Sequence, residues 1–168
     1  MTRAFLRLPE DAVSKLGGLR VREIMVRDPI TVDSERSVRE AALAMDRAGI
    51  GCVLVTSRRN DKEKAIGIAT EQDLVGRVLT KEGNISDLSV KNIMSSPLII
   101  VGPDATVVEA ASIMERNRVR RLPVVDQDGL IGVVTVSNLA KVLARQLEYS
   151  YAVLNAMARV SAPESMYA

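Results

Sequence analysis

The chain carries two copies of one segment, and this internal repeat restricts its fold more than any other feature of the sequence. The first copy starts at Val21 with VREIMVRDPITV, and the second starts at Val90 with VKNIMSSPLIIV. Near the end of each copy, GIATEQDL at 67–74 matches GVVTVSNL at 132–139. A unit of roughly 70 residues is too long for most solenoid repeats and here occurs twice. The repeat therefore predicts two similar units packed face to face as a pseudo-symmetric pair.

A helix is predicted near the start of each copy. Apolar residues at i, i+3, i+4 and i+7 form one buried face: Val38, Ala41, Ala42 and Met45, then Val107, Ala110, Ala111 and Met114. Candidates for the N-cap or first turn are Ser34, Ser37, Asp104 and Thr106. Gly49 and Asn117 are expected to adopt the left-handed conformation that ends these helices.

A strand hairpin and a second helix are predicted after each of these helices. Short β-branched runs at 53–55 and 122–125 predict buried strands, and polar turns are expected at 58–64 and 127–129. Second strands are expected at 65–69 and 130–134, followed by helices from Glu71 and Val136. Each unit is thus β-α-β-β-α, and the predicted fold class is α/β, with the two units packed as a pseudo-two-fold pair.

Four segments follow from this pattern: an N-terminal segment at 1–20, a first unit at 21–82, a second unit at 88–145, and a C-terminal helix extension with a tail at 146–168. A short helix is expected around Leu8–Leu16. The last helix continues its apolar period through Leu139, Val142, Leu143, Gln146, Leu147, Tyr151, Leu154 and Met157. This stripe is expected either to pack on its own chain or to form a subunit interface.

The composition excludes several classes of site. The chain has no histidine and one cysteine, Cys52, which rules out Ser-His-Asp and Cys-His catalysis, histidine-ligated metals, four-cysteine zinc and an intrachain disulfide. The net charge of +2 is too balanced for a general nucleic-acid-binding surface. No stretch approaches the ~20 apolar residues of a membrane span, and a signal peptide is not evident. We expect a soluble, cytoplasmic protein that does not enter a membrane.

Thr70 and Asp73 are candidate ligand contacts because they lie three residues apart where a strand passes into a helix. A carboxylate at this point can accept hydrogen bonds from both hydroxyls of a ribose. The alternative is structural, with Thr70 capping the helix and Asp73 complementing its dipole. In the second copy, Thr135 is retained and Asn138 replaces the aspartate, so that site lacks the charge.

Taken together, these motifs resemble the CBS-domain pair, or Bateman module. The resemblance rests on the Ile-Met dipeptide with a nearby Pro, on RRLPVVD at 120–126, and on the closing GIATEQD at 67–73. It extends over about residues 20–145, and the ordered recurrence of the motifs makes it specific. It implies two units packed through their sheets, with two related clefts. Such clefts commonly bind AMP, ADP, ATP, S-adenosylmethionine or methylthioadenosine.

The resemblance also implies which residues bind. A nucleotide held by one unit's Asp receives phosphate contacts from the other unit, just before its LPVVD strand. For Asp73 these are Arg120 and Arg121, whereas Gly51 and Cys52 occupy the matching positions for Asn138. The expected main nucleotide site comprises Ile68, Thr70, Asp73, Ser96, Pro97, Leu98, Ile99, Arg120 and Arg121. The expected weaker second site comprises Pro29, Ile30, Thr31, Val133, Thr135 and Asn138.

Three other functions stay open at this point. The module can act without ligand as a dimerisation or interaction platform, a role that the loss of the second aspartate favours. It can bind nucleic acid through the Arg116–Arg121 cluster, although the scarcity of aromatic residues argues against this. Carboxylates such as Glu71, Asp73 and Asp126–Asp128 could support a Mg²⁺-assisted reaction, but no nucleophile and base are paired, so we expect no catalytic residue, catalytic cofactor or metal site.

The resemblance further implies a homodimer. An enzyme, transporter or DNA-binding segment is not evident in the sequence, so we expect either a separate effector protein or a larger protein of which this chain is a piece.

Overall fold

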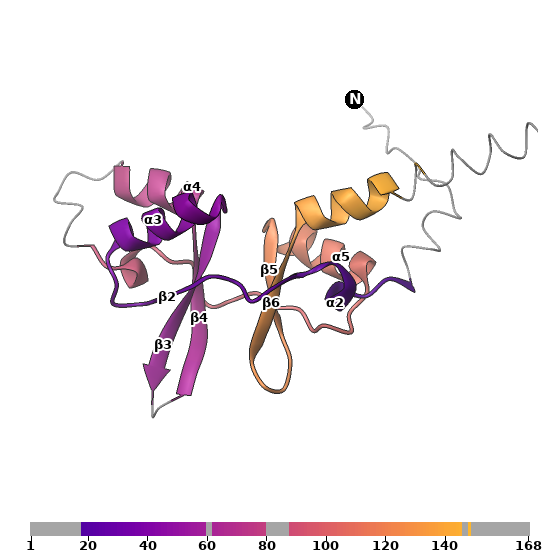
Figure 1. The fold of residues 1–168 in the computed structure, drawn as a ribbon, viewed down its shortest axis with the longest axis horizontal. Helices are drawn as coiled ribbons and strands as arrows, with labels where there is room; N and C mark the ends of the chain where they lie inside the picture. Colours follow the sequence, from indigo (N-terminus) through magenta and orange to yellow (C-terminus); the bar gives the residue numbers. More distant parts are fainter. Residues whose placement is uncertain (1–17, 60–61, 80–87, 146–147, 149–168) are drawn as a thin grey trace, which may run out of the picture.

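The computed structural model describes residues 18–59, 62–79, 88–145 and 148. It contains two three-stranded sheets, ordered β2-β3-β4 and β1-β6-β5, with helices gathered along one side of them (Figure 1). Each sheet belongs mainly to one repeat. The predicted α/β class and the pairing of two related units are therefore confirmed.

The first unit combines β2 (Thr31–Asp33), β3 (Cys52–Arg59) and β4 (Lys62–Thr70) with α3 (Val38–Ala48). Strand β2 runs parallel to β3, which pairs antiparallel with β4. A capping box starts α3, since the Ser37 hydroxyl accepts from the Glu40 N–H while the Glu40 carboxylate accepts from the Ser37 N–H. Gly49 ends the helix at a φ of 62°. The capping role of Ser37 and the left-handed Gly49 are confirmed.

The second unit combines β5 (Arg121–Val125) and β6 (Leu130–Thr135) with α5 (Val107–Asn117), which starts with the same capping box at Thr106 and Glu109. The expectation that Asn117 ends this helix in a left-handed conformation was wrong. Arg118 has that conformation, with a φ of 54°, because α5 has the same length as α3 and Asn117 is its last helical residue. The Asn117 side chain instead donates to the Ile113 carbonyl oxygen.

The opening segment of each repeat packs on the opposite unit. Helix α2 (Val21–Ile24) and strand β1 (Val26–Arg27) lie against the second unit, where β1 pairs antiparallel with β6. Figure 1 shows the indigo α2 beside the elements of the second repeat. The Val21 N–H donates to the Ala105 carbonyl oxygen, and the Val21 side chain is fully buried in the second core.

The second repeat makes the reciprocal contact. Its opening 3-10 helix η3 (Val90–Asn92) places Val90 in the core of the first unit, together with Ile93. Two ion pairs occupy equivalent positions in this exchange: Arg22 with Asp104, and Lys91 with Glu35. The units therefore interleave in space, and the boundaries at 21–82 and 88–145 stay predictions about the sequence.

The hairpin of the first unit is longer than predicted. The polar residues 58–64 were expected to form a turn, but β3 continues to Arg59 and β4 starts at Lys62. A ladder of backbone hydrogen bonds needs no apolar side chains, so these strands extend past the core. The shorter hairpin of the second unit turns through the predicted residues 127–129, and Asp128 and Gly129 donate their N–H groups to the Asp126 carboxylate.

Each unit ends in a helix at the predicted place. Helix α4 (Glu71–Leu74) continues as a π-helical turn, η1 (Val75–Leu79), and residues 136–145 are helical. The helix predicted around Leu8–Leu16 lies outside the described residues, and so do positions 146, 147, 151, 154 and 157 of the predicted helical period. None of the helices in the described ranges is long and apolar enough to cross a membrane.

Candidate functional site

A cavity of about 800 Å³ lies between the two units. The first repeat supplies residues at the β4–α4 junction and on η1, and the second supplies the loop before β5 and the start of the helix at 136–145. Its walls are formed by Ile68, Thr70, Glu71, Gln72, Asp73, Gly76, Arg77, Ser95, Arg118, Val119, Arg120, Arg121, Val136, Ser137 and Ala140. Five of the nine residues expected at the main site thus border one space: Ile68, Thr70, Asp73, Arg120 and Arg121.

Asp73 is bonded to Thr70 in a capping box at the start of α4. Its Oδ2 accepts from the Thr70 N–H at 2.9 Å and from the Thr70 hydroxyl at 2.7 Å, while the Asp73 N–H donates to that hydroxyl at 3.2 Å. Only 12% of the Asp73 side chain is exposed. Thr70 therefore caps the start of the helix, as in the structural alternative considered above. This cap uses one of the two carboxylate oxygens of Asp73.

The second oxygen of Asp73 faces Arg77, one turn further along the chain. Arg77 Nε lies 3.4 Å from Asp73 Oδ1, and Arg77 Nη1 donates to the carbonyl oxygens of Ile93 at 2.8 Å and Met94 at 3.0 Å. Arg77 was not among the site residues predicted from the sequence. The only signal for it was the i, i+4 spacing from Asp73, which is common on helices.

The cavity carries a net positive charge. Four guanidinium groups line it, from Arg77, Arg118, Arg120 and Arg121, against the two carboxylates of Glu71 and Asp73. The difference, four minus two, leaves two positive charges. Guanidinium groups bind phosphate in bidentate geometry, so the wall opposite Asp73 is suited to an anionic group.

Arg121 reaches across to the first unit at Gly51. A Cβ built on Gly51 would lie 2.5 Å from Arg121 Nη2 and 2.8 Å from Glu71 Oε2, so the absence of a side chain makes room for both charged groups. Burial raises the pKa of the neighbouring Cys52 thiol; the Arg121 charge opposes this rise and the Glu71 charge adds to it. Both units therefore meet at Arg121.

The segment expected to line an adenine pocket follows directly after a residue that borders the cavity. Ser95 borders the cavity and pairs with Ile68, its N–H donating to the Ile68 carbonyl oxygen at 2.8 Å. The expected residues Ser96, Pro97, Leu98 and Ile99 are not among its lining residues. The Ser96 hydroxyl donates to the Ile66 carbonyl oxygen, and Ile99 packs against the second core. Their role in binding stays a prediction.

The residues of the expected second site do not line either cavity described here. Asn138 repeats the capping box, since its Oδ1 accepts from the Thr135 N–H at 2.9 Å and from the Thr135 hydroxyl at 2.7 Å. The amide nitrogen of Asn138 is a donor where Asp73 has a second acceptor. Val133 pairs with Val26, Thr31 pairs with Leu54, and the Ile30 carbonyl accepts from the Leu54 N–H.

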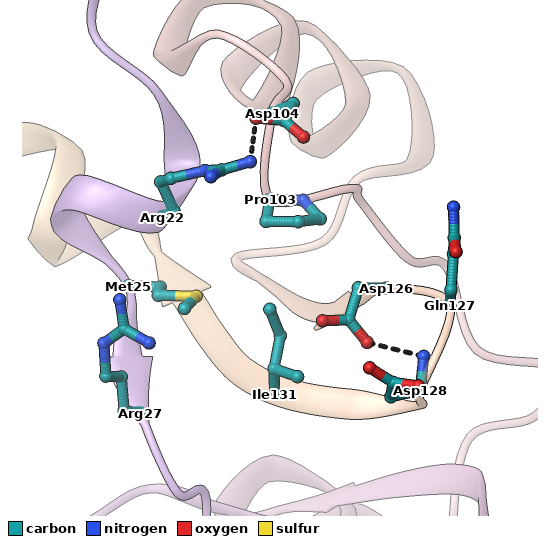
Figure 2. A pocket seen from close by; sticks show the side chains of 9 residues that line it. All are labelled: Arg22, Met25, Arg27, Pro103, Asp104, Asp126, Gln127, Asp128 and Ile131. Carbon is teal, nitrogen blue, oxygen red and sulfur yellow. Dashed lines mark hydrogen bonds and ion pairs between the residues drawn. The ribbon is translucent and has the colours of Figure 1, made fainter.

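A second cavity of about 660 Å³ lies beside the β5–β6 hairpin (Figure 2). It is lined by Arg22, Met25, Arg27, Pro103, Asp104, Asp126, Gln127, Asp128 and Ile131. The Asp126 carboxylate is held in its own turn, and Asp104 is paired with Arg22. Within residues 18–59, 62–79 and 88–145, no group of three or more Cys, Asp or Glu side chains is placed to hold a metal ion.

Two repeats of this topology, joined by exchanged opening segments, define a pair of CBS domains. The family model of the CBS domain matches residues 21–80 and 90–145, so the chain belongs to the CBS-domain family. The resemblance found in the sequence is confirmed.

Individual relatives agree with this assignment. An uncharacterized protein of Methanopyrus kandleri is 40% identical over 123 residues, covering 73% of this chain and 61% of the relative. The chain thus spans about three fifths of that protein's length. The crystal structure of a CBS-domain-containing protein of Agrobacterium tumefaciens is similar with a TM-score of 0.67 and 28% identity, covering 74% of this chain and 93% of that one.

A third protein has the same fold and a known ligand. The CBS-domain pair of the protein MJ0100 was crystallised with 5′-methylthioadenosine and S-adenosyl-L-methionine. It is similar to this chain with a TM-score of 0.66 and 23% identity, covering 76% of this chain and 97% of that one.

Proposed function

We propose that this chain is a non-catalytic regulatory module that binds AMP, ADP or ATP in the cavity between its two units. One observation carries the proposal. The Asp73 carboxylate of the first unit and the Arg120 and Arg121 guanidiniums of the second line the same cavity, although Arg120 follows Asp73 by 47 positions in the sequence.

The ribose and the phosphate of a nucleotide each have a complementary group in this cavity. Ribose hydroxyls donate to the carboxylate of Asp73, and phosphate oxygens accept from Arg120 and Arg121. The adenosyl ligands of the MJ0100 pair support the adenosine half of the proposal. The two positive charges favour a phosphorylated ligand over the cationic sulfonium of S-adenosylmethionine.

A ligand at this place can regulate because it contacts both units. It shifts the packing of the units, or of two modules in a homodimer, by the difference between its affinities for the two arrangements. We propose that the change is passed to a separate effector protein or to a further part of the same protein.

The Asp73→Ala substitution tests the site, with Asn138→Ala as the matched control in the second unit. Loss of a charged hydrogen-bond acceptor should weaken nucleotide binding by roughly 10- to 100-fold, whereas Asn138→Ala should leave it nearly unchanged. Isothermal titration calorimetry with AMP, ADP and ATP measures this. Equal affinity in wild type and Asp73→Ala would exclude Asp73 from the site.

Native mass spectrometry of the protein with the same nucleotides reports its oligomeric state together with any bound ligand. A dimer that carries one nucleotide per chain supports one strong site and a homodimer. Two per chain would mean that the Asn138 site also binds.

A ligand-free interaction module is the second candidate. Thr70 satisfies Asp73 through local hydrogen bonds, and Asn138 has the same bonds without a charge, so the capping geometry alone does not require a ligand. The arginine-lined cavity favours the nucleotide proposal over this alternative. Absence of binding for all three nucleotides, in a protein that is dimeric by mass spectrometry, would favour the interaction module.

A further inference from the structure

Arg77 connects the proposed ribose contact with the segment that crosses from the second repeat. Its Nε lies 3.4 Å from Asp73 Oδ1, and its Nη1 donates to the carbonyl oxygens of Ile93 and Met94. Arg77 Nη2 also lies 3.4 Å from the Ser95 hydroxyl. One side chain on η1 therefore holds both the carboxylate and the edge of the cavity at residues 93–95.

A ribose at Asp73 has to compete with this guanidinium. Asp73 Oδ2 already accepts two hydrogen bonds from Thr70, so Oδ1 is the oxygen with capacity for a further donor. Arg77 lies at that oxygen. The Asp73 side chain is only 12% exposed, whereas the Arg77 side chain is 46% exposed, so a displaced guanidinium stays in contact with solvent while the carboxylate stays inside the cavity.

A phosphate replaces the lost carboxylate with another anion, which water does not. Arg77 lines the same cavity as Arg118, Arg120 and Arg121, so a phosphate bound among them offers the displaced guanidinium a new anionic partner. Adenosine alone has no anionic group. It would break the Arg77–Asp73 pair and leave the guanidinium with carbonyl oxygens and water but no anionic partner.

The second unit lacks both members of this pair. By the alignment of the two repeats, Asn138 corresponds to Asp73 and Val142 corresponds to Arg77. The carboxylate and the arginine are thus present together in one copy and missing together in the other, as expected if they act as a pair at one site.

We propose that Arg77 is a specificity-determining residue that makes the Asp73 cavity select phosphorylated adenosine over adenosine itself. This inference rests on the proposed nucleotide site. The ion pair opposes every ribose that enters, and only a ligand with a phosphate recovers the lost interaction.

Titration of adenosine and AMP into wild type and Arg77→Gln tests the inference. The variant should bind adenosine more tightly and AMP more weakly, so that the preference for AMP falls by roughly 10-fold or more. Arg77→Lys keeps the charge but loses the planar fork of donors, so its preference for AMP over adenosine should lie between those of wild type and Arg77→Gln. Arg116→Gln is the control, because Arg116 does not line the cavity and should leave the preference unchanged.

The possible outcomes separate this inference from the function on which it rests. If wild type binds AMP and Arg77→Gln keeps the same preference, or loses both ligands by the same factor, Arg77 has no role in selectivity and the site itself stands. If wild type binds neither ligand, the nucleotide site and the inference fall together. Thermal unfolding followed by circular dichroism checks that Arg77→Gln is folded; if it is not, the Arg77→Lys titrations decide.

Discussion

Gly51 shows how one residue without a side chain shapes the boundary between the units. Glycine is often chosen for its backbone freedom, but Gly51 matters for space, since Arg121 Nη2 and Glu71 Oε2 would both lie within 3 Å of a Cβ at this position. The corresponding position of the second repeat is Arg120, which has a long charged side chain. The two repeats therefore differ in side-chain size and charge at a position where the units meet.

The Gly51→Ala substitution should turn Arg121 away from its present position. A methyl group there collides with the flexible end of Arg121, which can move without disturbing the core. We expect AMP affinity to fall by roughly 3- to 10-fold, with a smaller effect on adenosine, as measured by calorimetry. Gly102→Ala is the control, because a Cβ at Gly102 meets nothing within 4 Å. Unchanged AMP affinity in Gly51→Ala would show that Arg121 binds phosphate equally well from another position.

At the scale of elements, the helices of both units begin with the same reciprocal hydrogen bonds. The Ser37–Glu40 and Thr106–Glu109 boxes start α3 and α5, and the Thr70–Asp73 and Thr135–Asn138 boxes start the closing helices. The N–H and side chain of Ser37 lower the pKa of Glu40, and those of Thr106 lower the pKa of Glu109. These carboxylates are thus more stable as anions in the folded chain.

These shifts predict a dependence of stability on acid pH. A carboxyl whose pKa is lower when folded contributes stability above the ordinary Glu pKa of 4.5, and this contribution is lost as the pH falls through the folded value. The Glu40→Gln/Glu109→Gln double variant keeps neutral acceptors, so its urea midpoint should fall less than that of wild type between about pH 6 and pH 3. Glu115→Gln, at an exposed site on α5, is the control. Equal losses in wild type and double variant would contradict the prediction.

At the scale of the whole molecule, neither unit is complete without the other repeat. Val21, Ile24 and Met25 pack with the second core, while Val90, Ile93 and Met94 pack with the first. Each core therefore depends on residues that the chain supplies from the opposite repeat. A substitution that destabilises one core should therefore lower the stability of both units.

The interleaved cores predict a single cooperative unfolding transition. Calorimetric and van't Hoff enthalpies should agree, as they do for a two-state domain. Val21→Ala removes buried methyl groups from the second core and should destabilise the chain by about 1–3 kcal/mol without splitting the transition. Val26→Ala, at a side chain that is 52% exposed, is the control. A separate, earlier melting of the second unit would mean that the exchanged segments do not couple the units.

The sequence by itself determined the duplicated fold, the order of the helices and strands, and the helix starts. These features depend on local patterns: an apolar period sets the face of α3, and a three-residue spacing sets the Ser37–Glu40 box. The left-handed residue after α5 is Arg118 rather than Asn117, at the position that matches Gly49 in the first repeat, which shows the limit of reading such patterns by residue type.

Only the tertiary structure decided how the repeats exchange their opening segments and what surrounds Asp73. The proximity of Arg121 to Gly51, of Arg77 to the Ile93 carbonyl, and of Ser95 to the cavity joins residues distant in the chain. Such contacts depend on how the two sheets pack, and the spacing of residues along the sequence does not predict that packing. The repeat predicted two units, whereas the fold determined which residues of each unit meet.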